Sequence, residues 1–340
     1  MFQVPKILPS GATKILENIG IISYISFGTE TEDVNALTNI AKVLDEEPKE
    51  YVELLRKELK SGNSFPKARE IAVKEYLGND IKYENILNSP NNILAIEYMK
   101  NLKSLKSKID ILPIKREKTG YNDESIVEQF ASASAIRRLI CNKNFDELKQ
   151  VVPKSCYDIL AEEFELGNVI MSLKKFENEI LYELRRMSIK DIANLPDVSE
   201  GLEYTIKNGV NSCNNLNDLI NMIKSKRYTQ TRIQRILICT LLGITKSDMD
   251  MSKEVVPYAR VLGFNEKGKV LLSKINQNVG EAHLVTSVKK FVDNNKDEKI
   301  SRMLEIDAFA TDVYALKCKG EFKANMDFTK NMVKKCYNYS

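Results

Sequence analysis

Two kinds of hydrophobic pattern alternate along the first 140 residues of the chain. Apolar runs rich in β-branched and aromatic residues occupy residues 21–27 and 111–114, and each predicts a buried strand. A short helix over residues 11–18 is expected before the first run. Between the runs, apolar positions recur at helical spacing over residues 33–44, 48–59, 65–76 and 93–99. Strands separated by helices predict an α/β fold for this part of the chain.

Polar residues at the ends of these elements are candidates for ligand contacts. Gly28 follows the first strand, where backbone could approach a nucleotide, although glycine there is more often an ordinary turn residue. Asn91 and Asn92 precede the helix at 93–99. Either could cap that helix, or offer its amide to a ribose or a base edge. The second strand ends in the basic pair Lys115 and Arg116.

A serine-capped helix is expected after residue 131. Ser132 is a natural N-cap, Ser134 falls in the first turn, and apolar residues then follow at helical spacing. The start of a helix has free N–H groups and a positive dipole end, so it can hold an anion that Arg137 or Arg138 would reach. Such a segment is also commonly no more than a capped helix, and both interpretations stay open.

Strand patterns disappear beyond about residue 144, and helical spacing takes over. Helices are expected over residues 145–150, 155–164 and 169–186, with shorter ones at 191–195 and 200–208. We therefore predict an α/β domain over residues 1–145 and an all-α domain over residues 146–340.

Residues 224–242 combine an apolar helical stripe with a basic face. Between Asp218 and Asp248 the chain has no carboxylate but six basic residues, and Tyr228 shares a face with Arg232 and Arg235. Arginines that bind phosphate beside a tyrosine that stacks on a base would suit RNA. Basic faces are also often only solvated, so this pattern alone leaves both possibilities. The basic residues are Lys224, Lys226, Arg227, Arg232, Arg235 and Lys246.

Composition narrows the class of protein. The 340 residues are 43% hydrophobic and 29% charged, as in ordinary soluble globular proteins. The net charge of +4 is small for this length, so any nucleic-acid site should be a local patch. Six scattered cysteines without a Cys-x-x-Cys pair argue for reduced thiols in a cytoplasm and against structural zinc. The first residues form neither a signal peptide nor a membrane span, so we expect a cytoplasmic protein without a membrane partner.

Several motifs resemble a known family. The segment with Ser132, Ser134, Ile136 and Arg137 resembles the Ile-Ser-Ser-Thr-x-Ile-Arg signature of HIGH-superfamily nucleotidyltransferases. Together with five further stretches in chain order, it resembles the bacterial tRNA(Met) cytidine acetate ligases over nearly the whole chain. The further stretches are residues 24–30, 89–94, 114–123, 226–235 and 258–263.

This resemblance implies an incomplete Rossmann-like nucleotidyltransferase domain followed by a helical tRNA-binding domain. It implies that acetate and ATP form acetyl-adenylate, with Mg²⁺ as the expected metal ion, and that the acetyl group then passes to N4 of the wobble cytidine of elongator tRNA(Met). By the same resemblance, ATP would be bound by Gly28, Asn91 or Asn92, Lys115, Arg116, Ser132, Ser134 and Arg137. The tRNA would be bound by Lys224, Lys226, Arg227, Tyr228, Arg232 and Arg235.

One feature of the family is absent from the sequence. Members carry a His-x-Gly-His motif near the start, whereas this chain has a single histidine, His283, and begins as though the opening of the α/β domain were missing. We therefore expect weak or no catalysis by the chain alone. Two other functions stay open, a catalytically inactive tRNA-binding protein and an adenylyltransferase for a small metabolite.

Overall fold

The computed structural model describes residues 4–116, 131–225, 227–255, 258–277, 283–295 and 297–334. The chain divides into two compact units, and each is described by itself below. The first comprises residues 1–136 and 267–282, and the second comprises residues 137–266 and 283–340. The units divide between Ile136 and Arg137, whereas the sequence pattern places the domain boundary after residue 145.

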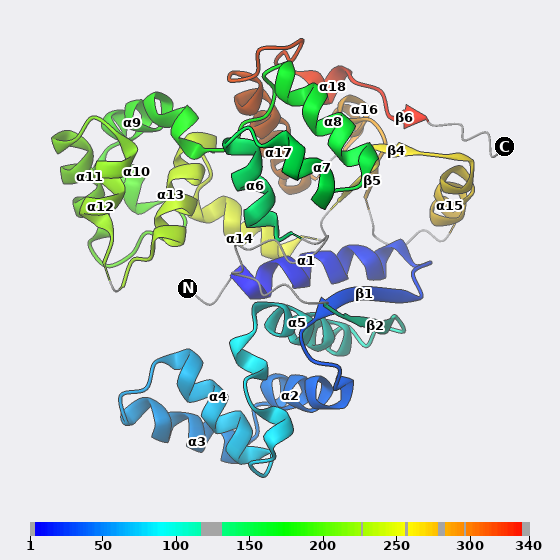
Figure 1. The fold of residues 1–340 in the computed structure, drawn as a ribbon, viewed down its shortest axis with the longest axis vertical. Coiled ribbons are helices and arrows are strands. Elements are labelled where there is room, and N and C mark those ends of the chain that lie inside the picture. The colour runs from blue at the N-terminus through cyan, green and yellow to red at the C-terminus, as the bar shows by residue number, and fades with distance from the viewer. Residues whose placement is uncertain are drawn as a thin grey trace. The chain divides into compact units, whose positions relative to one another are not determined.

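The first unit contains a two-stranded parallel sheet. Strands β1 (Tyr24–Thr29) and β2 (Asp110–Lys115) pair in register, so that Gly28 lies opposite Ile114 and both carboxyl ends meet at one edge (Figure 1). Phe27 packs into the core of the unit, and its ring stacks on Tyr98 at a centroid distance of 5.6 Å. The prediction of two strands is therefore confirmed.

The prediction that both strands are buried is wrong for one face of this sheet. Side chains alternate between the two faces of a strand, and the face opposite Phe27 is open. Three large side chains on that open face are 54% to 64% exposed, namely Tyr24, Leu112 and Ile114. A short apolar run thus predicts a strand but not the covering of both its faces.

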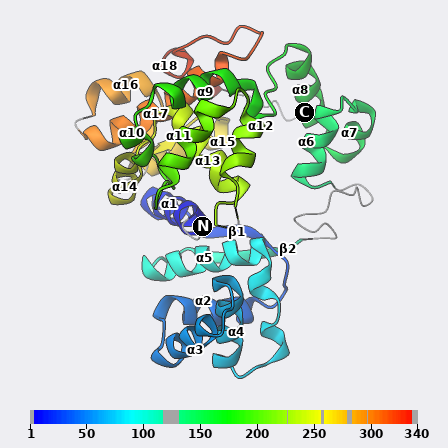
Figure 2. The ribbon, with the colours of Figure 1, turned by 90° about the vertical axis from the view of Figure 1, so that its left-hand side faces the viewer.

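Six of the described helices belong wholly or mainly to the first unit, and α5 lies between α1 and α2 (Figures 1 and 2). Helix α1 is longer than the predicted helix at 11–18 because it accommodates Pro9, whose carbonyl accepts a hydrogen bond from the Thr13 hydroxyl at 2.7 Å. The helices are α1 (Val4–Ile19), α2 (Val34–Glu46), α3 (Lys49–Lys60), α4 (Phe65–Tyr76), α5 (Pro90–Ser104) and α15 (Glu266–Gln277), with 3-10 turns at Ile81–Tyr83 and Ile86–Asn88.

The second unit is mostly helical. A core of aliphatic side chains, including the fully buried Ile180, Leu184 and Leu219, joins helices α9 to α13, which gather in one bundle (Figure 2). Its helices are α6 (Ala133–Cys141), which begins in the first unit, α7 (Phe145–Val151), α8 (Lys154–Glu165), α9 (Glu177–Arg186), α10 (Ile189–Ala193), α11 (Leu202–Ser212), α12 (Leu216–Ile223), α13 (Gln230–Leu242), α14 (Lys246–Glu254), α16 (Val288–Asn294), α17 (Glu298–Ala315) and α18 (Met326–Thr329).

Two expectations for this unit are corrected. Residues 169–186 do not form one helix, because the Ser172 hydroxyl caps a separate 3-10 turn (Leu173–Phe176) by accepting from the Lys174 N–H at 3.2 Å. The unit is also not purely helical. Strands β3 (Ala259–Arg260) and β5 (Leu284–Val285) pair in parallel, as do β4 (Gly263–Phe264) and β6 (Val333–Lys334). Two-residue strands are too short to leave a periodic pattern in the sequence.

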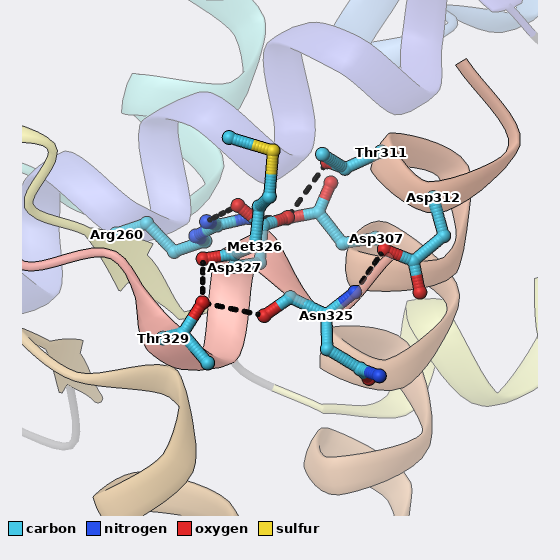
Figure 3. A network of polar contacts seen from close by, with 8 residues as sticks. All are labelled: Arg260, Asp307, Thr311, Asp312, Asn325, Met326, Asp327 and Thr329. Carbon is cyan, nitrogen blue, oxygen red and sulfur yellow. Dashed lines mark hydrogen bonds and ion pairs between the residues drawn. The ribbon is translucent and has the colours of Figure 1, made fainter. Parts of the chain in front are cut away.

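A partly buried ion-pair network ties β3 to α17 and α18 (Figure 3). The Arg260 guanidinium contacts Asp327 through both terminal nitrogens, at 2.7 and 3.2 Å, and reaches Asp307 at 2.9 Å. The Thr311 hydroxyl donates a further hydrogen bond to Asp327 at 2.7 Å. The network therefore holds three segments of the second unit together. Among the described residues, no helix is long and apolar enough to cross a membrane.

Candidate nucleotide and RNA sites

The carboxyl ends of β1 and β2 bring Gly28 and Arg116 into contact. The Arg116 N–H donates to the Thr29 carbonyl at 2.8 Å, which extends the strand pairing by one residue. A Cβ atom on Gly28 would lie 3.2 Å from Cγ of Arg116 and 3.4 Å from its Cδ. Gly28 lies within β1 and not in a turn, so the glycine leaves room for the stem of the arginine.

Asn91 and Asn92 reach the same edge from the first turn of α5. The expectation that either one caps this helix is wrong, because Ser89 is the N-cap and Pro90 occupies the first helical position, which proline favours. Their side chains instead bind Glu30, the residue that follows β1. The Glu30 N–H donates to Asn92 Oδ1 at 2.8 Å, and Asn91 Nδ2 donates to Glu30 Oε1 at 2.9 Å.

Lys115 completes the group of polar side chains at this edge. Its ammonium lies 2.7 Å from Glu32, in an exposed pair that adds little to stability. The structure thus brings together five of the predicted ATP-binding residues from three separate stretches of sequence: Gly28, Asn91, Asn92, Lys115 and Arg116.

Two further residues of this region were not predicted from the sequence. Glu30 joins the two asparagines to β1, and its partners lie 61 and 62 residues further along the chain, so no local pattern indicates the contact. The Ser89 hydroxyl is buried, and among the described residues it has no hydrogen-bond partner although it stands at the start of a helix. A buried hydroxyl without a partner is uncommon and marks a polar position that a ligand would complete.

Ser132 caps α6 as the sequence predicts. Its hydroxyl accepts from the Ala135 N–H at 3.1 Å, and only 5% of the residue is exposed. Ser134 and Arg137 are exposed on the same helix. No hydrogen bond between described residues joins the Ser132 cap to the strand ends, and residues 117–130, which include part of the family motif, lie outside the described residues.

The basic face of α13 is bound to a loop of its own unit. Arg232 donates to the Asp197 carbonyl from Nε at 2.9 Å and to the Ser199 hydroxyl at 3.0 Å, while Arg235 pairs with the Asp197 carboxylate at 2.8 Å. This loop is sharply turned, because Asp197 and Glu200 both have positive φ angles, of 64° and 58°. The predicted apolar stripe is confirmed, since Ile233, Ile236, Leu237 and Thr240 are all buried.

The remaining predicted RNA contacts also meet this loop or lie beside it. Arg227 forms an ion pair with Glu200, and the Tyr228 hydroxyl donates to the Ser199 carbonyl at 3.3 Å. The Arg232 guanidinium lies over the Tyr228 ring, 4.9 Å from the ring centroid. The arginine therefore covers a face of the ring that was predicted to stack on a base. Lys224 is exposed at the end of α12, and Lys226 lies outside the described residues.

The single histidine packs against an aromatic side chain. The His283 ring lies edge-on to Phe291 at a centroid distance of 5.8 Å. Within the described ranges, no three His, Cys, Asp or Glu side chains gather as metal ligands. The described cysteines, Cys141, Cys156, Cys213, Cys239 and Cys318, are free thiols.

Comparisons with known proteins match this chain over nearly its full length. The family model of the HIGH nucleotidyl transferases matches residues 3–328. The tRNA(Met) cytidine acetate ligase of Acetivibrio thermocellus is 42% identical over 332 residues, covering 95% of this chain and 80% of that protein. The ligase of Thermoanaerobacter sp. (strain X514) is 41% identical over 328 residues, covering 95% of this chain and 79% of its own.

Two crystal structures of Thermotoga maritima TmcAL have the same fold. The apo form has a TM-score of 0.87 at 27% identity, covering 98% of this chain and 82% of that chain. The form bound with alpha-thio ATP has a TM-score of 0.85 at 26% identity, covering 97% of this chain and 80% of that chain. Sequence and fold agree, and the chain belongs to the tRNA(Met) cytidine acetate ligase family of the HIGH nucleotidyl transferases.

Proposed function

We propose that this chain is an ATP-dependent ligase that joins acetate to N4 of the wobble cytidine of elongator tRNA(Met). The observation that carries the proposal is the match over 95% of the chain to relatives of that name, at up to 42% identity. The shared fold with a TmcAL structure that holds alpha-thio ATP supports the use of ATP. The polar side chains gathered at the carboxyl ends of β1 and β2 support the use of ATP independently.

The first step would take place at these strand ends. An acetate oxygen attacks the α-phosphorus of ATP, forming acetyl-adenylate and releasing diphosphate. Such a step depends more on positive charge and orientation than on a nucleophilic side chain. Arg116 and Lys115 supply the positive charge, Gly28 allows close approach, and the asparagine amides orient the nucleotide. We infer that Mg²⁺ enters with the ATP phosphates, where it would offset part of their negative charge.

The Ser132 helix would hold a phosphate of the same nucleotide. Its start offers free N–H groups, and Ser134 and Arg137 are exposed on it, so both can reach an anion. The hydroxyl of Ser132 already caps the helix, so we assign the phosphate contact to the backbone of the first turn and to Ser134 and Arg137.

The second step would use the helical unit. The N4 amine of the cytidine attacks the acetyl carbonyl carbon of acetyl-adenylate, AMP leaves, and the amine loses a proton. We propose that Lys224 and Lys226 meet the phosphates of tRNA directly. Arg227, Arg232 and Arg235 would do so where the RNA replaces or adds to their contacts with the loop at Asp197 to Glu200. Tyr228 would stack on a base.

The test measures each step in the purified full chain. Acetate-dependent exchange of labelled diphosphate into ATP reports the first step, and mass spectrometry of digested tRNA(Met) for N4-acetylcytidine reports the second. The ligase function predicts both activities, and it predicts that Arg116→Ala abolishes the exchange. Arg56→Ala is the matched control, because Arg56 is an exposed arginine of α3 in the same unit. Absence of exchange at saturating ATP and acetate would refute the ligase function.

A second function is favoured by the histidine content. The one histidine among the 340 residues packs on Phe291 in the second unit, so the His-x-Gly-His chemistry of the family has no counterpart within this sequence. Binding of tRNA(Met) without exchange would identify a catalytically inactive RNA-binding protein. Exchange without any tRNA binding would instead favour an adenylyltransferase for a small metabolite.

A further inference from the structure

Glu30 holds both asparagine side chains at the predicted ATP site. Its backbone N–H binds Asn92 Oδ1 and its carboxylate binds Asn91 Nδ2, at 2.8 and 2.9 Å. We propose that Glu30 is a positioning residue that fixes the orientation of both amides and thereby sets the preference of the site for adenine. This role rests on the proposed use of ATP, and it makes Glu30 a determinant of nucleotide specificity.

These hydrogen bonds decide which amide atoms are left for a ligand. An asparagine offers one oxygen that accepts and one nitrogen that donates. Asn92 uses its oxygen on Glu30 and keeps its nitrogen, whereas Asn91 uses its nitrogen and keeps its oxygen. Within the described ranges, neither of the two remaining atoms has a hydrogen-bond partner. The pair therefore presents one donor and one acceptor.

On the base edge that carries N7, a donor and an acceptor together match adenine better than guanine. Adenine presents an N6 amino donor beside the N7 acceptor, whereas guanine presents two acceptors, O6 and N7, on the same edge. A flipped Asn91 amide would offer two donors and favour guanine. The carboxylate of Glu30 prevents that flip, because a carboxylate only accepts hydrogen bonds and so requires the Asn91 nitrogen.

The backbone around Glu30 is held on both sides. Thr29 is buried, and its hydroxyl donates to the Thr31 carbonyl at 2.8 Å. The Asp33 N–H donates to the Thr31 hydroxyl at 3.2 Å, and the Asp33 carboxylate caps α2 by accepting from the Ala36 N–H at 2.8 Å. Glu30 therefore lies in a short segment fixed by its neighbours, as a positioning residue requires.

Simple electrostatics makes the opposite prediction for this residue. A carboxylate close to a triphosphate repels it, so removing the charge alone should tighten ATP binding. Loss of the hydrogen bond that orients Asn91 should instead weaken ATP binding. The sign of the change on substitution therefore separates a positioning residue from an incidental surface acid. The Glu30 side chain is exposed, so its truncation leaves no cavity in the core.

The experiment is calorimetric titration of the full chain with ATP and with GTP. We expect Glu30→Ala to raise the Kd for ATP about three- to tenfold, the usual effect of one hydrogen bond, and to narrow the preference for ATP over GTP. Glu30→Gln keeps an acceptor oxygen and should stay within about twofold of the unmodified chain. The control is Glu46→Ala, which removes a carboxylate that binds Lys103 at the far end of α5, at 2.6 Å, and should change neither Kd.

A double substitution tests the assigned contact directly. On the Asn91→Ala background, Glu30→Ala should cause no further loss of ATP affinity, because its side-chain partner is already gone. Equal or tighter ATP binding by Glu30→Ala, or a full additional loss on that background, would overturn the positioning role. If the unmodified chain bound no ATP, the proposed function would fail together with this inference. Wild-type binding with an unaffected Glu30→Ala variant would overturn this inference alone.

Discussion

Asp327→Asn tests how the polar network of the second unit contributes to stability. The Arg260 and Asp327 side chains are only 19% and 17% exposed, so the pair is largely shielded from water. Removing one partner of a buried ion pair typically costs about 3–5 kcal/mol. Here Asp307 still accepts from Arg260 at 2.9 Å, which offsets part of the loss. We therefore expect Asp327→Asn to lower the free energy of unfolding by about 2–3 kcal/mol at pH 7.

The effect of this substitution should depend on pH in a defined direction. Burial by itself would raise the pKa of Asp327, but the hydrogen bonds from Arg260 and Thr311 and the nearby positive charge lower it overall. A carboxyl whose pKa is lowered by folding stabilises the protein above its unfolded pKa of about 4, and the contribution is lost as the pH falls through the folded value. The difference between the wild type and Asp327→Asn should therefore shrink below about pH 4.

Urea denaturation followed by far-ultraviolet circular dichroism at pH 7 and at lower pH measures this difference. Asp250→Asn is the control, because Asp250 pairs with Lys253 at the surface and is 69% exposed, so its loss should cost less than about 0.5 kcal/mol. Equal stability of the wild type and Asp327→Asn at pH 7, or a difference that does not change with pH, would refute the reasoning.

Four further substitutions test packing and binding. Gly28→Ala places a Cβ 3.2 Å from Cγ of Arg116 and should weaken ATP binding several-fold by titration, while the free energy of unfolding falls by less than about 1.5 kcal/mol. Arg232→Ala removes hydrogen bonds to Asp197 and Ser199 and should lower the free energy of unfolding, measured in urea, by about 1.5–3 kcal/mol. Lys224→Ala should leave the free energy of unfolding unchanged. It should reduce the slope of the logarithm of the tRNA-binding constant against the logarithm of the salt concentration by about one unit. Leu184→Ala removes a fully buried side chain and should cost about 2–5 kcal/mol in the same assay.

Features that depend on neighbours in sequence are the ones that the sequence predicts well. The helix at 65–76 has the predicted ends, Ser132 caps α6, and the stripe with Ile233, Ile236 and Leu237 is buried. Each of these follows from helical spacing or from a capping preference that acts within four residues. The strands β1 and β2 were found for the same reason, because each is a short continuous apolar run.

Features that depend on distant partners were not predictable in the same way. Arg232 and Arg235 were predicted to face solvent or RNA, and they bind Asp197, which lies 35 and 38 residues earlier in the chain. Glu30 was not recognised because its partners come from another helix. Asn91 and Asn92 fall in the first turn because Pro90 takes the first helical position, which leaves Ser89 as the N-cap.

The contacts of the basic residues reconcile a structural role with an electrostatic one. Arg232 and Lys207 bind backbone carbonyls, Arg232 that of Asp197 and Lys207 three at the end of α9. A carbonyl carries no net charge, so these contacts hold the cations in place and offset only part of their positive charge. Arg227 and Arg235 pair with carboxylates, which cancel their charge. An RNA phosphate would therefore be attracted by Arg232 and Lys207 without any contact being broken, whereas it would have to displace an acid from Arg227 or Arg235. Substitution of Arg232 or Lys207 should therefore change the salt dependence of tRNA affinity differently from substitution of Arg227 or Arg235. Attraction of tRNA to the carbonyl-bound cations requires no rearrangement of the helical unit.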